Sequence, residues 1–230
     1  MRRLSLLVEG QGDVAAVPAL VGQLLADLPA ELQGHLFLDD APLKTGGIHQ
    51  LTGRRSGDFV RLLGVANKRP KLGAALLVLD GDTETIESNP FCAVAAARLL
   101  AERARDAGAG TIFSFAAVFL RQEYESLFIA VADQLPGYTP KGTTPPDPEE
   151  TPRGAKGWLH ERLADGYNPT DRQLVLTRAV KNWEPARALK SFRRLEHALV
   201  ELATAVALGE HVASPSLPPP EVPGEAATAD

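Results

Sequence analysis

Acidic side chains follow two apolar runs of the sequence, and these carboxylates are its clearest candidates for chemistry. Glu9 comes directly after residues 4–8, and Asp80 and Asp82 come directly after residues 74–79. If both runs are parallel strands, their carboxyl ends meet at one edge of a sheet, where ligands bind in open α/β folds. Carboxylates gathered there would repel one another unless a cation neutralised them. Because no Cys or His lies at ligand spacing, we expect a hard ion, Mg²⁺ or Mn²⁺.

The Asp-x-Asp spacing suits a metal, since residues two apart in an extended chain project to the same side. A third acidic cluster, Glu123 and Glu125, follows the apolar residues 111–120. We expect Glu123 to be a further metal ligand, with a helix cap as its alternative role. A turn or a cap also explains each acidic motif taken alone. Their joint placement at strand ends is what favours a metal site.

The elements that must position these side chains alternate between strand and helix. Apolar runs predict strands at 4–8, 36–38, 74–79 and 111–120. Helical spacing predicts helices from Asp13 as the N-cap to residue 28, around 59–65, over 91–105 and over 123–133. Unbroken apolar runs are typical of parallel strands covered on both faces. The sequence therefore predicts an α/β fold, with a mainly parallel sheet of about four strands between helices.

Proline and residue periodicity divide the chain. Six of the 18 prolines lie in 136–152 and five in 213–230, and the latter segment has no aromatic residue. We expect an α/β core over 1–136, a proline-rich connection over 137–152 and a helical extension packed on the core over 153–212. The tail over 213–230 has little apolar surface to bury, which predicts disorder.

The charge is unevenly distributed along the chain. A net charge of −5 at pH 7 argues against a nucleic-acid partner, but residues 41–71 contain seven Lys or Arg against a single Asp. Local basic density is what attracts phosphates. We expect Lys44, Arg54 and Arg55 to bind a phosphate backbone, because Arg does so in a bidentate manner. A solvated surface is the alternative interpretation of this basic segment.

Several classes of protein are excluded. One cysteine, Cys92, rules out a disulfide scaffold and a cysteine zinc site. No run approaches the ~20 apolar residues of a membrane span, and Glu9 ends the first apolar run too early for a signal peptide. We therefore expect a cytoplasmic protein that does not enter membranes. A P-loop is absent, and the third glycine of a dinucleotide fingerprint is missing.

The two acidic motifs and their order resemble a known signature. The motifs are LVEGQGD at 7–13 and LVLDGD at 77–82. They resemble the TOPRIM signature, which is a glutamate after the first strand and an Asp-x-Asp after a later one. Topoisomerases, bacterial primases and OLD-type nucleases share it. Two further stretches, RQEYE at 121–125 and GAKGWL at 154–159, resemble short stand-alone TOPRIM-like proteins of unknown function, and this resemblance covers roughly residues 1–205.

The resemblance implies a division of roles among the site residues. Glu9 would be a metal-associated carboxylate and general acid or base, while Asp80 and Asp82 would hold Mg²⁺ at a scissile phosphate. Lys156 would neutralise developing charge, with a surface turn as its alternative role. No tyrosine lies in a recognisable nucleophile context, so hydrolysis is expected rather than strand transfer to the protein.

The resemblance also implies a function. It predicts a metal-dependent nuclease that hydrolyses phosphodiesters of DNA or RNA, controlled by an AAA-type ATPase partner in anti-phage defence. The main alternative is a catalytically silent TOPRIM-like subunit that docks on the ATPase, and a homo-oligomer is left open. A haloacid-dehalogenase-like phosphatase is less favoured, because Glu84 stands where its Asp-x-Asp motif requires Thr or Val and because it leaves Glu9 unexplained.

Overall fold

A parallel sheet forms the centre of the molecule in the computed structural model, which describes residues 1–141, 149 and 154–216. Among these residues the sheet has six strands, and every pairing is parallel. In spatial order the strands are β2 (Leu36–Leu38), β1 (Arg2–Val8), β4 (Leu72–Asp80), β7 (Ser114–Leu120) and β8 (Ala213–Ser214), and β3 (Leu43–Lys44) also pairs with β1. The predicted α/β fold with a mainly parallel sheet is confirmed.

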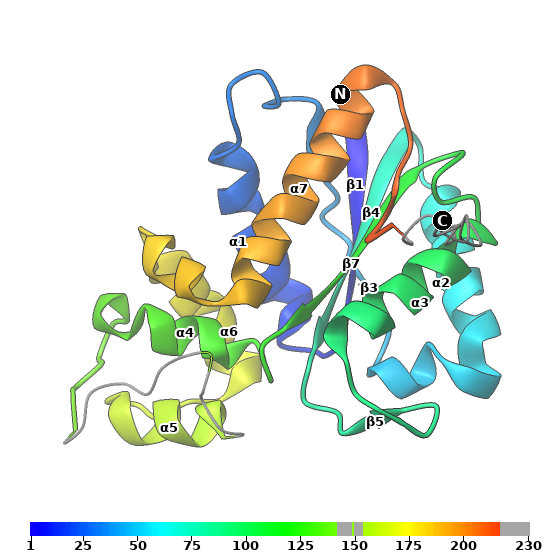
Figure 1. Cartoon of the computed structure of the whole chain (residues 1–230). Coiled ribbons are helices and arrows are strands. Elements are labelled where there is room, and N and C mark those ends of the chain that lie inside the picture. The colour runs from blue at the N-terminus through cyan, green and yellow to red at the C-terminus, as the bar shows by residue number, and fades with distance from the viewer. Residues whose placement is uncertain (142–148, 150–153, 217–230) are drawn as a thin grey trace, which may run out of the picture.

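Four helices cover the two faces of this sheet (Figure 1). The first face carries α1 (Asp13–Ala26) and α7 (Lys190–Leu208), and the second carries α2 (Ser56–Asn67) and α3 (Ala93–Arg105). Successive strand residues point to opposite faces, so Leu6 enters the core with α1 and α7 while Leu7 enters the core with α2 and α3. This double burial explains why the strands read as unbroken apolar runs.

The C-terminal helices share one core with the sheet. The short helices α4 (Glu125–Ala130), α5 (Ala155–Arg162) and α6 (Pro169–Ala179) lie together beyond the ends of the strands, below α1 in Figure 1. The longer α7 packs along β7 and buries Phe192, Leu195, Leu199 and Leu202 completely. These residues belong to the same apolar cluster as Leu6. The described part of 153–212 is therefore mainly helical, as its periodicity predicts, and its last helix, α7, forms a layer of the core.

The remaining elements are short. They are the 3-10 turns η1 (Ile48–Gln50), η2 (Gly53–Arg55), η3 (Ala132–Gln134) and η4 (Glu184–Ala188) and the antiparallel pair β5 (Thr85–Ile86) and β6 (Asn89–Pro90). The predicted helix over 123–133 is α4 followed by η3. None of the helices described is both long and apolar enough to cross a membrane.

The structure differs from the sequence prediction at both short edge strands. Six strands are present rather than about four, because β3 and β8 have two residues each and are too short to show a periodicity. The expected tail begins in the sheet, since Ala213 and Ser214 pair with Phe115 and Ala116. Residues 217–230 of that tail, and 142–148 and 150–153 of the proline-rich connection, lie outside the described residues.

Gly81 allows the ends of two strands to approach each other. A Cβ at this position would lie 2.6 Å from the backbone oxygen of Leu120, at the end of β7. Backbone atoms cannot move aside as a flexible side chain can, so the Asp-Gly-Asp motif requires its glycine for packing as well as for any turn.

We predict that Gly81→Ala lowers the free energy of unfolding by about 1–3 kcal/mol, the usual range for overpacking. The matched control is Gly64→Ala in α2, where an added Cβ meets nothing within 4 Å. That variant should stabilise the protein by about 0.5–1 kcal/mol, because alanine favours the helix. Urea denaturation measures both, and equal stabilisation by the two substitutions would contradict the close approach.

Candidate functional site

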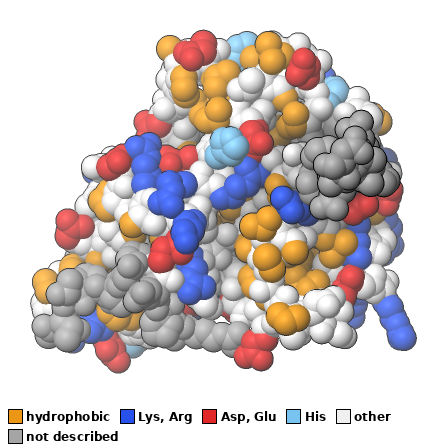
Figure 2. All heavy atoms as spheres, viewed as in Figure 1, with side chains coloured by type: hydrophobic (Ala, Val, Ile, Leu, Met, Phe, Trp, Pro, Cys, Tyr) orange, Lys and Arg blue, Asp and Glu red, His pale blue; other side chains and the backbone are white. Residues whose placement is uncertain are grey.

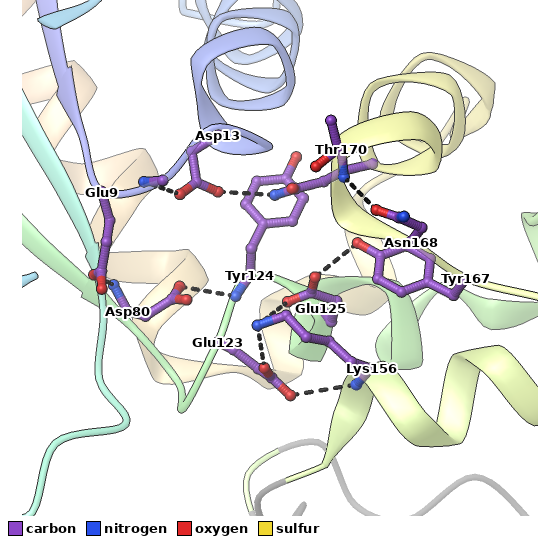
Figure 3. Close-up of polar contacts among 12 residues, drawn as sticks. Glu9, Asp13, Asp80, Glu123, Tyr124, Glu125, Lys156, Tyr167, Asn168 and Thr170 are labelled. Carbon is purple, nitrogen blue, oxygen red and sulfur yellow. Dashed lines mark hydrogen bonds and ion pairs between the residues drawn. The ribbon is translucent and has the colours of Figure 1, made fainter. Parts of the chain in front are cut away.

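The carboxyl ends of β1 and β4 place Glu9 beside Asp80. Val8 and Val78 are paired on these neighbouring parallel strands, and each strand then runs directly into its acidic residue. Glu9 Oε2 accepts a hydrogen bond of 3.1 Å from the backbone N–H of Asp80. Figure 3 shows the Glu9 carboxylate beside the Asp80 backbone, with the Asp80 carboxylate directed towards the backbone N–H of Tyr124. The expected meeting of the first two acidic motifs is therefore observed in the structure.

The third acidic segment is tied to the same edge. Asp80 Oδ1 accepts a hydrogen bond of 3.0 Å from the backbone N–H of Tyr124, which follows β7. The Tyr124 hydroxyl lies 2.8 Å from Thr177 Oγ1 of α6, and the ring is buried. Asp80 thus connects β4 to the segment after β7, and Tyr124 continues the connection to the helical extension.

Burial and like charge act together on the two central carboxylates. Burial raises the pKa of Glu9, and the nearby charges of Asp82 and Asp13 raise it further, against the Asp80 backbone hydrogen bond, which lowers it. Burial also raises the pKa of Asp80 well above its usual value, with added repulsion from Asp13, Glu9 and Glu125. Partly buried carboxylates that repel one another are the arrangement that a cation would relieve.

Asp13 is a member of this acidic edge that the sequence prediction missed. It was expected to cap α1, but the N-cap is Gly12, and no side-chain cap bond forms there. Asp13 Oδ2 instead accepts from the backbone N–H of Gly10, and Oδ1 accepts from Gln173 Nε2, both at 2.9 Å. The carboxylate turns back towards the strand ends because the turn after Glu9 needs an acceptor. Its position four residues after Glu9 was the available signal.

Lys156 lies between the two glutamates that follow β7. Its Nζ is 2.6 Å from Glu123 Oε2 and 3.7 Å from Glu125 Oε2. Burial lowers the pKa of Lys156, but the hydrogen bond to Glu123 and the charges of Glu125 and Glu123 outweigh it, so the pKa is raised. Lys156 is therefore a permanent cation at the acidic edge (Figure 3).

Glu125 is the most buried acid of this group, with 2 % of its side chain exposed. Burial raises its pKa, while Lys156 and the Tyr167 hydroxyl lower it. The Tyr167 hydroxyl donates a hydrogen bond of 2.7 Å to Glu125 Oε1. Glu123 and Glu125 thus serve as partners of Lys156 from α5, and the role of Glu123 as a metal ligand stays a prediction.

Asp82 lies at the rim of the site. It is exposed, and its charge reaches Glu9. Within the described part of the chain, no group of three or more His, Cys, Asp or Glu side chains is arranged to hold a metal ion. The structure thus brings Glu9 and Asp80 together, but it does not gather Asp82 or Glu123 with them into a set of three ligands. Two carboxylates still suit Mg²⁺, which is often held by one or two of them together with substrate phosphates and water.

The segment that follows Lys44 lies against Glu9. The backbone N–H groups of Thr45 and Gly46 donate to the carbonyl oxygens of Val8 and Glu9. A Cβ placed on Gly47 would be 3.1 Å from Glu9 Oε1. The start of the basic segment is therefore beside the acidic edge.

Other parts of the basic segment have different surroundings. His49 Nε2 is 2.9 Å from Thr83 Oγ1, which joins η1 to the loop after β4. Arg54 and Arg55 are exposed in η2. Arg69 instead pairs with the buried Asp39 and so stabilises the far end of the sheet. The phosphate-binding roles of Lys44, Arg54 and Arg55 stay predictions.

Comparisons with protein-family models, with curated proteins and with solved structures give no match for this chain. The TOPRIM-like character is therefore a proposal carried by the residues and the fold.

We predict that Asp80→Asn stabilises the metal-free protein at neutral pH by about 1 kcal/mol, because it removes a partly buried charge that neighbouring carboxylates repel. The folded pKa of Asp80 is raised, so the wild type loses stability as pH rises through that pKa. Asparagine avoids this loss and can still accept from Tyr124. The gain should vanish at pH values below the ordinary pKa of Asp.

Thermal unfolding in EDTA across the pH range measures this effect. The matched control is Asp106→Asn, an exposed aspartate that follows α3, which should leave the transition temperature unchanged. A destabilised Asp80→Asn protein at neutral pH would show that the Asp80 carboxylate is favourably paired.

Proposed function

We propose that this protein is a TOPRIM-like, Mg²⁺-dependent nuclease that hydrolyses phosphodiester bonds of DNA or RNA. The observation that carries the proposal is the contact between Glu9 and the backbone of Asp80 at the carboxyl ends of adjacent parallel strands. The order of motifs agrees with a TOPRIM domain, since the glutamate follows the first strand and the Asp-x-Asp follows a later, central one.

The chemistry of the donor set supports a hard divalent cation. Glu9 and Asp80 offer only oxygen ligands, and their raised pKa values reflect burial and repulsion from neighbouring carboxylates. When bound, the ion would supply Lewis-acid stabilisation for the phosphoryl oxygens of the substrate. In the proposal, Asp82 would add a third oxygen to the ion.

The residues around this pair have distinct roles in the proposal. Glu9 is the candidate general acid or base of the proposal, and burial together with the charges of nearby carboxylates raises its pKa. Lys156 stays charged and can stabilise negative charge near Glu123. Lys44, Arg54 and Arg55 would bind the phosphate backbone of the substrate.

The tyrosines favour hydrolysis over covalent attachment of a strand. Tyr124 is buried with its hydroxyl bonded to Thr177, and the hydroxyl of buried Tyr167 donates to Glu125. Burial raises the pKa of both phenols. Neither is therefore suited to attack a phosphate, and water is the nucleophile of the proposal.

The proposal extends to control by an AAA-type ATPase partner in anti-phage defence, in the cytoplasm. This part rests on the resemblance of the RQEYE and GAKGWL stretches. The structure supports their importance to the site, since Glu123, Glu125 and Lys156 of these stretches contact one another.

The test is incubation of the full chain with plasmid, linear DNA, tRNA and total RNA in Mg²⁺ or Mn²⁺. We expect Asp80→Asn and Glu9→Gln each to lower the cleavage rate by about 100-fold or more, as loss of a transition-state stabilising group does. Asp106→Asn should cleave like the wild type. Equal cleavage rates for the wild type and Asp80→Asn, with and without the ATPase, would overturn the proposal of a nuclease.

Calorimetric titration with Mn²⁺ separates the nuclease from the silent subunit. The wild type should bind Mn²⁺, and Asp80→Asn should bind it at least tenfold more weakly, because one of two central ligands is lost. Absence of both binding and cleavage would instead support a catalytically silent subunit of an ATPase complex.

A further inference from the structure

A cavity of about 510 Å³ lies between α3 and α7, at the edge of the sheet next to β7. It lies where β8 pairs only with Phe115 and Ala116, because residues 117–120 of β7 pair with β4 on one side and have no strand on the other side in the described structure. Those four residues form the floor of the cavity. Its volume is in the range of sites for small molecules and cofactors.

The cavity has an apolar side and a basic side. Phe91, Val94, Ala97 and Phe119 supply apolar surface, and the rings of Phe91 and Phe119 pack edge to face. Figure 2 shows hydrophobic side chains gathered on this face of the molecule beside Lys and Arg side chains. Most pockets for drug-sized ligands combine such an apolar wall with a few placed polar groups.

The charged lining is mainly positive. Four Arg or Lys residues line the cavity against two Glu residues. Arg194 is paired with Glu201 at 2.7 Å, and Arg121 Nε donates to the backbone oxygen of Glu149 at 2.8 Å. Arg98 and Lys190 have no ion-pair partner among the described residues, so they leave an excess of positive charge for a ligand.

Two buried polar atoms of this lining have no hydrogen-bond partner in the part of the chain that the structure describes. They are Arg98 Nε, a donor, and Gln122 Oε1, an acceptor. Buried side-chain atoms of this kind are nearly always bonded in folded proteins. The guanidinium of Arg98 and the amide of Gln122 therefore offer a ligand of this cavity donor and acceptor groups that the described residues do not fully use.

We propose that this cavity binds a small organic anion with an apolar or aromatic body. The anionic group would lie at Arg98, with Lys190 nearby, and the body would lie on Phe91, Val94 and Phe119. The inference does not depend on the nuclease, because it uses neither Glu9 nor Asp80. The cavity nevertheless adjoins the acidic edge, since Gly81, between the two aspartates, is part of its lining.

The first test uses two fluorescent probes that differ in charge. The anionic probe is 8-anilinonaphthalene-1-sulfonate, which carries a sulfonate and an N–H on an aromatic body. Its neutral counterpart, N-phenyl-1-naphthylamine, lacks only the sulfonate. We expect the anionic probe to bind the full-length protein saturably with a stoichiometry of one, and more tightly than the neutral probe.

Substitution on α3 locates the site. Arg98→Gln should weaken the anionic probe about tenfold, the effect of losing one charge-assisted hydrogen bond, and should change the neutral probe less than threefold. The matched control, Arg105→Gln, alters an arginine on the same helix that does not line the cavity, and it should change neither affinity.

A second variant keeps the test valid if Arg98→Gln does not fold. Val94 lines the cavity but is 55 % exposed, so Val94→Glu adds a repelling charge without opening the core. It should also weaken the anionic probe about tenfold, whereas Val65→Glu, at a valine on α2 that is 49 % exposed, should not. Unsaturable binding, equal affinities for the two probes, or equal affinities of the wild type, Arg98→Gln and Val94→Glu would overturn the proposal.

Discussion

The hydrogen bond from the Asp80 backbone to the Glu9 carboxylate depends on the parallel pairing of β1 with β4, and the acidic edge is organised around it. Parallel pairing places both carboxyl ends at the same side of the sheet, so two acidic residues that are distant in sequence must share one partly buried space. The sheet and the hydrogen bond from the Tyr124 backbone to Asp80 hold these carboxylates close together although they repel each other.

The surrounding elements can be understood as supports for that edge. Gly81 allows β4 and β7 to converge beyond their last residues, and Asp13 closes the turn that follows Glu9. Lys156 brings positive charge to the glutamates after β7, although the proline-rich connection separates it from them in the sequence. The cavity between α3 and α7 adjoins the same edge through Gly81.

Much of the fold followed from local pattern. The apolar runs at 4–8 and 74–79 predicted β1 and β4, because a strand covered on both faces has no polar position. The Asp-x-Asp and the preceding strand predicted where Asp80 would lie. The local pattern did not predict β8, because this two-residue strand is set by its pairing with β7 rather than by its own residues. It also did not predict the role of Asp13, whose carboxylate accepts hydrogen bonds from Gly10 and Gln173 instead of capping the helix.

The sequence by itself determined the residue types, the strand order along the chain and the presence of carboxylates after the first and central strands. These are local properties, set by apolar spacing and by the few residues next to each strand. Only the tertiary structure decided that the Asp80 backbone donates to the Glu9 carboxylate, that Lys156 pairs with Glu123, and that one side of β7 is left open beside Arg98. Such contacts join residues far apart in the chain, and their geometry depends on how strands and helices pack, which no local pattern records.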